Sequence, residues 1–279
     1  MTEAAIIGGG LFGCIIARSL QQQGFQVTII DNAEPFAGSR PAACLMKPSW
    51  CTTIGKEAYS SSMQLLESLY EVKEIEFHTK VAKTKVRWID PKVILSPAVN
   101  RFSEQIIRIH WSKDLQIWEL YSSNGGSYTT KLCILAAGVW CNNILLASNL
   151  PLVPNLSPVT GTSFICAGKV EKPRILLWRP YKQAVFWEMY PKHIWIGDGE
   201  TAKEYTEQHL MKSRNRCAEF LNRDPMHLSP TMGHRPYVKD AKPFYLEQHA
   251  PGLWVITGGA KNGTIAAGWA AGELSRRII

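Results

Sequence analysis

The sequence predicts an α/β fold, in which a parallel sheet assembled from separate segments is interleaved with a mainly antiparallel β domain. Three observations predict it. A glycine-rich turn joins an apolar strand to a helix within residues 4–20, and a second glycine-rich turn joins a β-branched run to an alanine-rich helix within residues 255–274. Between these turns lie short runs in which apolar and polar residues alternate, as they do in antiparallel strands.

Composition limits the class of protein before any motif is considered. The 279 residues, 46% of them hydrophobic, are enough for one large core or two smaller ones. No apolar run approaches the ~20 residues of a membrane-spanning helix, and the chain enters a strand almost at once, so we expect a cytoplasmic protein without membrane contact. Seven cysteines without a C-x-x-C pair favour reduced thiols over a disulfide framework, and we expect no metal site.

The opening segment, "AAIIGGGLFGCIIARSLQQQGFQVTIID", has the order of a dinucleotide-binding βαβ unit: strand, G-x-G-x-x-G turn, helix and second buried strand. Its three glycines permit a tight turn, let the backbone approach a diphosphate, and let the helix pack on the strand. The free N–H groups at the helix N-terminus then bind the diphosphate. Asp31, at the end of the second strand, is placed to accept hydrogen bonds from ribose hydroxyls and to repel a 2′-phosphate. The predicted cofactor contacts here are Gly8, Gly10, Leu11, Phe12, Gly13 and Asp31.

The continuation of the chain distinguishes between two dinucleotides. The motif alone fits FAD or NAD, but the regular βα repeats expected of an NAD enzyme do not follow it. The pattern instead predicts a helix over 55–70 and strands over 83–89, 104–111 and 115–123. A buried strand then enters the small-residue turn at 136–138, which resumes the first sheet after an insertion and favours FAD.

The second half predicts the antiparallel domain. Four alternating runs between residues 160 and 200 precede a helix over 207–222. We expect these strands to cover the cofactor. The predicted domains are a discontinuous cofactor-binding domain, 1–55, 101–150 and 236–279, and a substrate or cap domain, 56–100 and 151–235.

Four motifs in a fixed order resemble the FAD-dependent D-amino acid oxidase and glycine oxidase family. They are the opening turn, "AGSRPAACLMKP" at 37–48, "ILAAGVW" at 134–140, and "GHRPYVKDAKPF" with "PGLWVITGGAKNGTIAAG" at the end. The resemblance implies a glutathione-reductase-like or D-amino acid oxidase-like fold with a Rossmann-type FAD-binding domain. It also implies that the last turn starts a helix directed at the isoalloxazine ring. The flavin contacts it implies are Ser39, Arg40, Ala43, Cys44, Leu45, Met46, Ala137, Gly138, Trp140, Gly258, Gly259, Ala260, Lys261, Asn262, Gly263 and Thr264.

The resemblance further implies a chemistry and a set of candidate residues. Members of the family move hydride from the carbon beside an amine nitrogen to flavin N5. Arg235 matches the arginine that binds the substrate carboxylate, and the alternative is a structural salt bridge with Asp240. Lys261 stands where glycine oxidases carry another arginine, and Lys47 where the residue is usually small, so both join Arg235 as candidate catalytic residues. Three roles are open for Lys47: binding a carboxylate, assisting the reaction with oxygen, or pointing to water. We expect a structural role for His234. The candidate pocket walls are Trp178, Tyr181, Trp187 and Tyr190, and the alternative for each of these aromatic residues is a place in the sheet core.

Positive charge is concentrated in two places. The net charge is +8, and the stretches 78–92 and 169–182 are rich in lysine and arginine, each with a tryptophan, Trp88 or Trp178. This pattern fits DNA or RNA binding, and it fits a solvated strand face as well.

Three functions follow from these observations. The first is oxidation of a glycine-like group on a modified nucleic-acid base, which would release glyoxylate and leave an amine. The chain resembles, in its opening and closing motifs, the flavin domain of tRNA wobble-uridine modification enzymes that remove a carboxymethyl group. The second is an oxidase of free glycine, sarcosine or a small D-amino acid that produces hydrogen peroxide. The third is a flavin-binding maturation partner.

Overall fold

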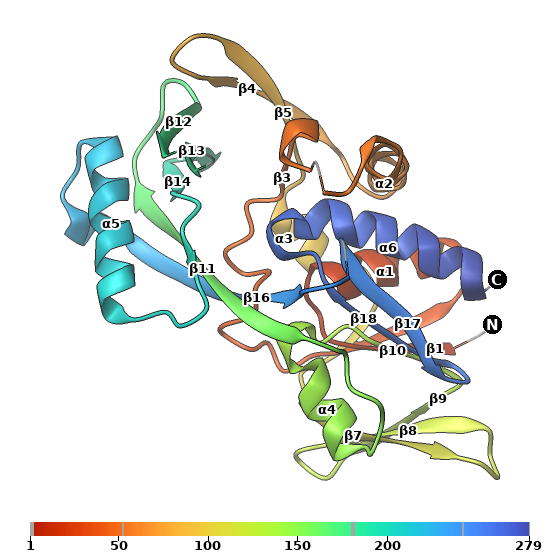
Figure 1. Ribbon diagram of the computed structural model, residues 1–279. Helices are drawn as coiled ribbons and strands as arrows, with labels where there is room; N and C mark the ends of the chain where they lie inside the picture. The colour runs from red at the N-terminus through yellow and green to blue at the C-terminus, as the bar shows by residue number, and fades with distance from the viewer. Residues whose placement is uncertain (1–2, 52, 180–181, 242, 279) are drawn as a thin grey trace.

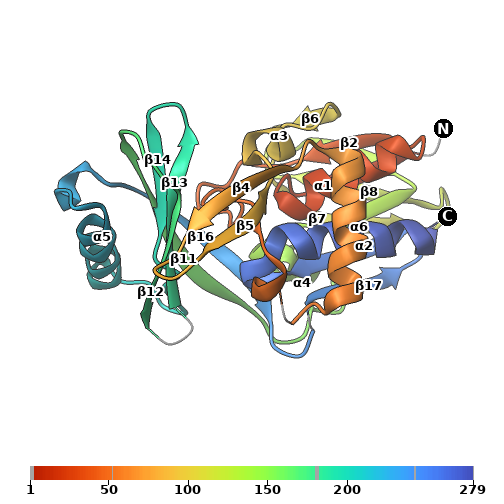
Figure 2. The same cartoon turned by 90° about the horizontal axis from the view of Figure 1, so that it is seen from above.

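The computed structural model describes residues 3–51, 53–179, 182–241 and 243–278, and within these ranges it does not describe the side chains of Trp178, Arg179 and Lys182. Two parts lie next to each other (Figures 1 and 2). One contains helices α1 (Leu11–Gln22), α2 (Lys56–Leu69) and α6 (Gly263–Ile278), and the other contains α5 (Glu207–Leu221). Long strands connect the two parts, so residues from both can meet between them.

The first part is built on a six-stranded sheet in the order β17-β18-β10-β1-β2-β6. All neighbouring pairs are parallel except β17 with β18. Parallel strands end at the same edge, so the turns that follow β1, β10 and β18 meet there. The strands are β1 Glu3–Ile7, β2 Gln26–Ile30, β6 Asn100–Phe102, β10 Leu132–Leu135, β17 Phe244–Ala250 and β18 Leu253–Gly258.

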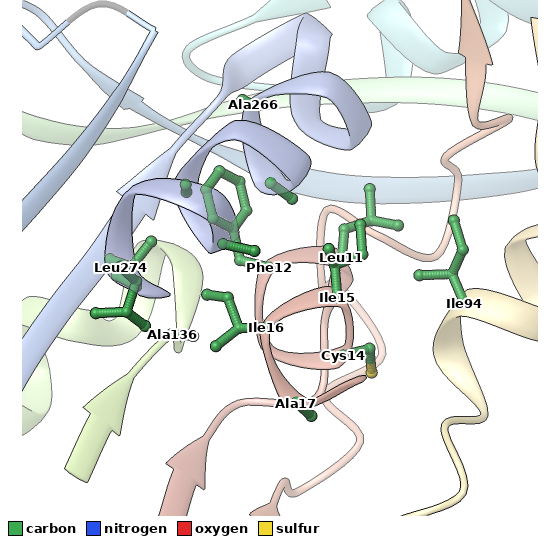
Figure 3. Close-up of a cluster of buried hydrophobic side chains, with 14 of the residues drawn as sticks. Leu11, Phe12, Cys14, Ile15, Ile16, Ala17, Ile94, Ala136, Ala266 and Leu274 are labelled. Atoms are coloured by element: carbon green, nitrogen blue, oxygen red, sulfur yellow. The ribbon is translucent and has the colours of Figure 1, made fainter. Parts of the chain in front are cut away.

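Helices α1 and α6 pack against each other and against this sheet. Figure 3 shows Phe12 and Ile16 of α1 close to Ala266 and Leu274 of α6, and all four are buried. The apolar faces of the two helices therefore pack together in the core, and this packing fixes the positions at which both helices begin.

Helix α2 packs on α6 through a close approach. Ser62 Oγ donates a 2.7 Å hydrogen bond to the carbonyl of Ile265. A Cβ atom added at Gly268 would lie 2.4 Å from the same Ser62 oxygen, so this crossing requires glycine.

The second part is a nine-stranded sheet in the order β15-β11-β14-β13-β12-β4-β5-β3, with β16 paired to β11. The β11–β16 pairing is antiparallel and runs from Leu156 opposite Val238 to Ile165 opposite Ser229. Helix α5 covers this sheet, with Cys217 and Ala218 packed on its core. The strands are β3 Leu45–Met46, β4 Lys73–His78, β5 Lys83–Trp88, β11 Leu156–Ala167, β12 Arg174–Arg179, β13 Lys182–Tyr190, β14 His193–Gly197, β15 Thr201–Ala202 and β16 Ser229–Val238.

A small third sheet, β7-β8-β9, packs beneath the first. Its buried Trp118 donates a 2.9 Å hydrogen bond from Nε1 to the carbonyl of Pro251, which ties it to the turn before β18. The remaining elements are β7 Ile106–Ser112, β8 Ile117–Ser122, β9 Ser127–Thr130, α3 Pro91–Leu95, α4 Cys141–Ala147, and 3-10 turns at Pro48–Trp50, Gly138–Trp140, Pro225–His227 and Ala260–Asn262.

The structure confirms the predicted fold class and the main elements, including the helix over 55–70, now α2. The predicted domain boundaries stay a prediction, although residues 56–100 are divided between the two parts. Helix α2 packs on α6 beside the first sheet, whereas β4 and β5 join the second. Among the described residues, no helix has the length and apolar character needed to span a membrane.

Candidate functional site

A cavity of about 760 Å³ lies at the edge where the two glycine-rich turns meet. Gly8 and Gly10 of the first turn line it, Ala137 of the middle turn lines it, and so do Gly258 and Gly263 of the last turn. A volume of this size suits a large organic ligand. Both ends of the chain therefore contribute to one site.

The first turn is too crowded to accept side chains. Gly8 has a φ of +105°, and a Cβ atom there would lie 2.5 Å from the carbonyl oxygen of Ala136. A Cβ atom at Gly13 would lie 1.9 Å from the Gly8 oxygen, and one at Gly10 would lie 2.8 Å from Ser39 Oγ. Gly8 and Gly10 thus present bare backbone to the cavity, while Gly13 permits close packing behind it.

The loop over 37–46 is tied to the start of α1. Ser39 Oγ accepts a 2.9 Å hydrogen bond from the Leu11 N–H, which occupies one of the first donors of the helix. Ala43, Cys44, Leu45 and Met46 follow along the cavity wall, as expected from the sequence.

Two thiols lie at this wall. Burial raises the pKa of Cys44 to about 12 and that of Cys51 to about 11, so both are neutral thiols near pH 7. The Cys51 thiol donates to Asn262 Oδ1 at 3.6 Å, which links the loop to the last turn. Neutral, hydrogen-bonded thiols favour a packing role here.

The last turn leads into helix α6. Gly258 and Gly259 have φ values of +105° and +84°, and a Cβ atom at Gly259 would lie 2.9 Å from the Phe12 ring. Gly259 therefore packs on α1 and is not part of the cavity wall, whereas residues 260–264 line it. The first turn of α6 contains no acidic residue, so its positive end is available to negative charge in the cavity.

Asp31 lines the cavity at the end of β2 and has a partner that the sequence did not reveal. Arg101 Nη2 donates to Asp31 Oδ2 at 2.6 Å. Asp31 Oδ1 has no hydrogen-bond partner among the described residues. The carboxylate is thus oriented by one cation and keeps an oxygen for a ribose hydroxyl.

These features fit FAD. The glycine cradle, the N-terminus of α1 and Asp31 suit a diphosphate and a ribose, and the N-terminus of α6 suits the electron-rich end of a flavin. Side chains at Gly8 or Gly10 would fill the cradle. The described residues contain no cluster of three or more metal-ligating side chains.

Arg235, on β16, lines the cavity from the second part. Within the described part of the chain no carboxylate forms an ion pair with it, and burial lowers the pKa of its guanidinium. Asp240, the alternative partner, instead accepts a 3.0 Å hydrogen bond from Asn155 Nδ2. A desolvated guanidinium that faces a cavity without an acidic partner favours an anionic ligand over a structural salt bridge.

His234 is held from three sides. Its Nδ1 lies 2.8 Å from Thr160 Oγ1, and its ring lies 5.7 Å from the Phe36 ring and 6.4 Å from the Trp140 indole. These contacts are those of a residue that shapes the wall.

The structure places Arg40 and Lys47 outside the cavity wall, so these two predictions need correction. Arg40 donates to the carbonyls of Ala33 and Glu34, because the turn over 34–40 directs it to the surface. Lys47 Nζ lies 5.9 Å from the Trp50 ring, and Trp50 is the residue that reaches the cavity. Lys261 does line the cavity, and its Nζ lies 3.5 Å from the Gly199 carbonyl oxygen.

The predicted pocket walls were largely wrong where the structure tests them. Trp187 is buried in a core cluster, 5.1 Å from the Trp88 ring, and does not line the cavity. Tyr190 donates to Asp90 Oδ1 at 3.1 Å. Tyr181 lies outside the described residues, and so does the side chain of Trp178. Strand alternation alone could not tell which face of the sheet meets the cofactor, and the wall is formed instead by Trp50, Thr162, Gln183, Val185 and Trp195.

Three cations of the basic stretch 78–92 form ion pairs, two within the hairpin of β4 and β5 and one with helix α2. Lys83 pairs with Glu76 at 2.8 Å, and Lys85 pairs with Glu74 at 2.7 Å. Arg87 pairs with Glu67, and Trp88 is 8% exposed. This tryptophan therefore belongs to the core and not to a stacking surface.

The second basic stretch lies beside this hairpin. Arg174 of β12 is the backbone partner of His78 of β4. Lys169, Lys172 and Arg174 are exposed. The two stretches thus meet where β4 and β12 are neighbours in the second sheet.

Comparisons with known proteins agree with the fold and with a flavin-dependent family. A family model described as "FAD dependent oxidoreductase" (DAO) matches residues 3–90 and 84–277. A 69-residue segment, 24% of this chain, is 38% identical to the tRNA 5-methylaminomethyl-2-thiouridine biosynthesis bifunctional protein MnmC of Caulobacter vibrioides, and it spans 12% of that protein.

Two solved structures share the fold at low sequence identity. Iminodiacetate oxidase from Chelativorans sp. BNC1 superposes with a TM-score of 0.70 at 15% identity, covering 98% of this chain and 94% of that chain. Glycine oxidase from Geobacillus kaustophilus superposes with a TM-score of 0.63 at 15% identity, covering 99% and 94%.

Proposed function

Because the chain belongs to the DAO family of FAD-dependent oxidoreductases, we propose that it oxidises an amine that carries a carboxylate, and that this amine is a glycine-like group on a modified nucleic-acid base. The observation that carries the proposal is Arg235. It is a guanidinium with no acidic partner among the described residues, and it faces the cavity that both glycine turns line. Its fork of donors suits a bidentate carboxylate.

Bound FAD would supply a two-electron acceptor for the hydride on the carbon beside the amine nitrogen. The nitrogen lone pair would complete a C=N bond, and hydrolysis of this bond would give an amine and glyoxylate. The chain supplies position and charge. Arg235 fixes the carboxylate, and residues 260–264 bring the positive end of α6 to the same cavity. The thiols of Cys44 and Cys51, whose pKa values are raised by burial, are neutral near pH 7 and do not act as bases there.

The nucleic-acid part of the proposal has separate support. One segment of the chain is similar to MnmC, a protein whose name places it in tRNA thiouridine biosynthesis. Lys169, Lys172 and Arg174 are exposed beside the hairpin of β4 and β5, where they are available to phosphates.

A second candidate function is the oxidation of free glycine, sarcosine or a small D-amino acid with formation of hydrogen peroxide. The ion pairs of Lys83, Lys85 and Arg87 favour it, because they remove three cations from the proposed nucleic-acid surface.

The anaerobic visible spectrum of the flavin-loaded protein tests these functions. Glycine, sarcosine, D-alanine and an oligonucleotide bearing a glycyl-methyl uracil are added in turn, and the flavin band at about 450 nm is followed. We expect bleaching with the oligonucleotide and not with the free amino acids, together with release of glyoxylate.

Each other result selects a different function. Bleaching by a free amino acid contradicts the nucleic-acid substrate and supports the second candidate. Failure of every amine to bleach a bound flavin supports a maturation partner with no turnover of its own. Absence of flavin binding contradicts the whole proposal.

A further inference from the structure

Arg235 has an unusual support inside the sheet. Its guanidinium rests on the backbone of Gly161 in β11, because a Cβ atom at Gly161 would lie 2.7 Å from both Cζ and Nη2 of Arg235 and 3.0 Å from Nη1. Three atoms of the guanidinium thus lie close to the space that a side chain at residue 161 would occupy. The planar group is laid against bare backbone.

The backbone of Gly161 is held from both sides. Gly161 is opposite Gly233 in the β11–β16 pairing and opposite Thr201 in the β11–β15 pairing. Its neighbours are buried and hydrogen-bonded, since Thr160 Oγ1 contacts His234 Nδ1 at 2.8 Å and Thr162 Oγ1 donates to the Tyr205 hydroxyl. The strand therefore has no freedom to move away from an added side chain.

We propose that Gly161 is a positioning residue for the carboxylate site, which sets the plane and depth at which Arg235 presents its guanidinium to the substrate. The inference rests on the proposed function, since it assigns to Arg235 a carboxylate ligand. When an added atom lies between a fixed strand and the end of a long flexible side chain, the side chain moves and the strand does not. An added methyl group at residue 161 displaces the guanidinium and leaves the sheet in place.

This geometry separates positioning from folding. Gly161 has no positive φ that would require glycine for the backbone itself. Alanine is therefore compatible with the strand backbone, and the three heavy atoms nearest to its added Cβ all belong to the Arg235 guanidinium. A glycine needed for the fold would behave in the opposite way, with loss of stability and of flavin.

The test compares Gly161→Ala with Arg235→Lys, their double variant and the control Gly272→Ala, where an added Cβ atom meets nothing within 4 Å. The probe is acetate, titrated into flavin-loaded protein and followed by calorimetry and by the flavin spectrum. We expect Gly161→Ala to weaken acetate binding about tenfold. Its flavin affinity and melting temperature stay close to those of Gly272→Ala. Adding Gly161→Ala to Arg235→Lys has little further effect, because the slimmer ammonium does not meet the methyl group.

The outcomes distinguish a failure of the carboxylate site from a failure of the role proposed for Gly161. Acetate that binds wild type no more tightly than Arg235→Lys contradicts the carboxylate site itself, and with it the proposed function. Acetate that is weakened by Arg235→Lys but bound within twofold of wild type by Gly161→Ala overturns only the role of Gly161. Loss of flavin or a large fall in melting temperature in Gly161→Ala also overturns it, because Gly161 is then required for the fold.

Discussion

The guanidinium of Arg101, on β6, donates a 2.6 Å hydrogen bond to the Asp31 carboxylate at the end of β2. Its other terminal nitrogen donates to the carbonyl of Leu95 at 2.9 Å, and a Cβ atom at Gly9 would meet Arg101 Nη2 at 2.6 Å. The strand at the edge of the first sheet therefore brings a cation to the acid that the sequence pattern predicts for the ribose.

Replacing Asp31 should weaken flavin binding. We expect Asp31→Ala to raise the dissociation constant of FAD about 10- to 100-fold, because it removes hydrogen-bond acceptors worth about 1 kcal/mol each and leaves Arg101 unpaired. Arg101→Met, which leaves the acceptor in place, should have a smaller effect. Quenching of flavin fluorescence during titration of the apoprotein measures both. Arg40→Met is the matched control, and an equal loss in that variant would contradict the placement of Arg40 at the surface.

Gly13 should tolerate no side chain. A Cβ atom there lies 1.9 Å from the Gly8 oxygen, and both groups belong to backbone that has nowhere to move. We expect Gly13→Ala to lower the free energy of unfolding by about 3 kcal/mol and to yield protein without flavin. Gly272→Ala, in the interior of α6, should instead raise stability by about 0.5–1 kcal/mol. Thermal unfolding and flavin content report both, and a stable, flavin-loaded Gly13→Ala would refute this packing.

Much of this site was predictable because its determinants are local. Gly8, Gly10 and Asp31 lie in one short βαβ unit whose strand, turn and helix periods can be read directly. The same holds for the last turn, where Gly258 precedes an alanine-rich helix. The alternation of apolar residues in a strand, and a backbone conformation that requires glycine, depend on only a few adjacent residues, so both can be predicted from the sequence.

The remainder depends on contacts that no local pattern records. Arg101 reaches Asp31 across 70 residues, and Gly161 supports Arg235 through a strand pairing. The choice of Trp187 failed for a similar reason: alternation predicts two faces of a strand, and only the packing of Trp88 and Phe77 shows which face is core. A glycine flanked by threonines in a strand was the available signal for Gly161, since glycine inside a strand often marks a close approach.

His249 should make stability depend on pH. Burial lowers the pKa of its imidazole from 6.5, while Nε2 lies 2.9 Å from the Tyr245 hydroxyl and Glu247 acts in the opposite direction. The folded state binds this proton less readily than the unfolded chain. The contribution of neutral His249 to folding stability is therefore complete above about pH 6.5, and it is lost as the pH falls through the lowered pKa of the folded state.

We therefore expect the melting temperature of wild type to fall more steeply between pH 7 and pH 5 than that of His249→Gln. His110→Gln, at an exposed position, should follow wild type. Equal slopes in all three proteins would show that His249 does not contribute.

The cysteines should be unreactive in the folded protein. All seven are free and buried. Burial raises the pKa of Cys51, the thiol nearest the last turn, to about 11, so little thiolate forms at pH 8. We expect a disulfide reagent to titrate almost no thiol within minutes in the native state and the full set after unfolding. Rapid labelling of Cys51, identified by peptide mass, would contradict the neutral, hydrogen-bonded thiol.

The exposed cations of the second basic stretch offer a test of the nucleic-acid surface. In the variant Lys169→Gln, Lys172→Gln, Arg174→Gln we expect weaker binding of a tRNA-sized RNA. The slope of log affinity against log salt should fall by about 1 for each phosphate that the variant no longer binds. The control removes the same number of charges at the exposed residues Lys113, Lys131 and Lys239, which lie between strands elsewhere in the chain.

Fluorescence anisotropy between 50 and 200 mM salt, a range over which phosphate binding responds strongly, measures both variants. Since the two carry equal net charge, equal slopes would mean that the RNA responds to overall charge. The exposed cations beside β4 and β12 would then have no specific part in binding.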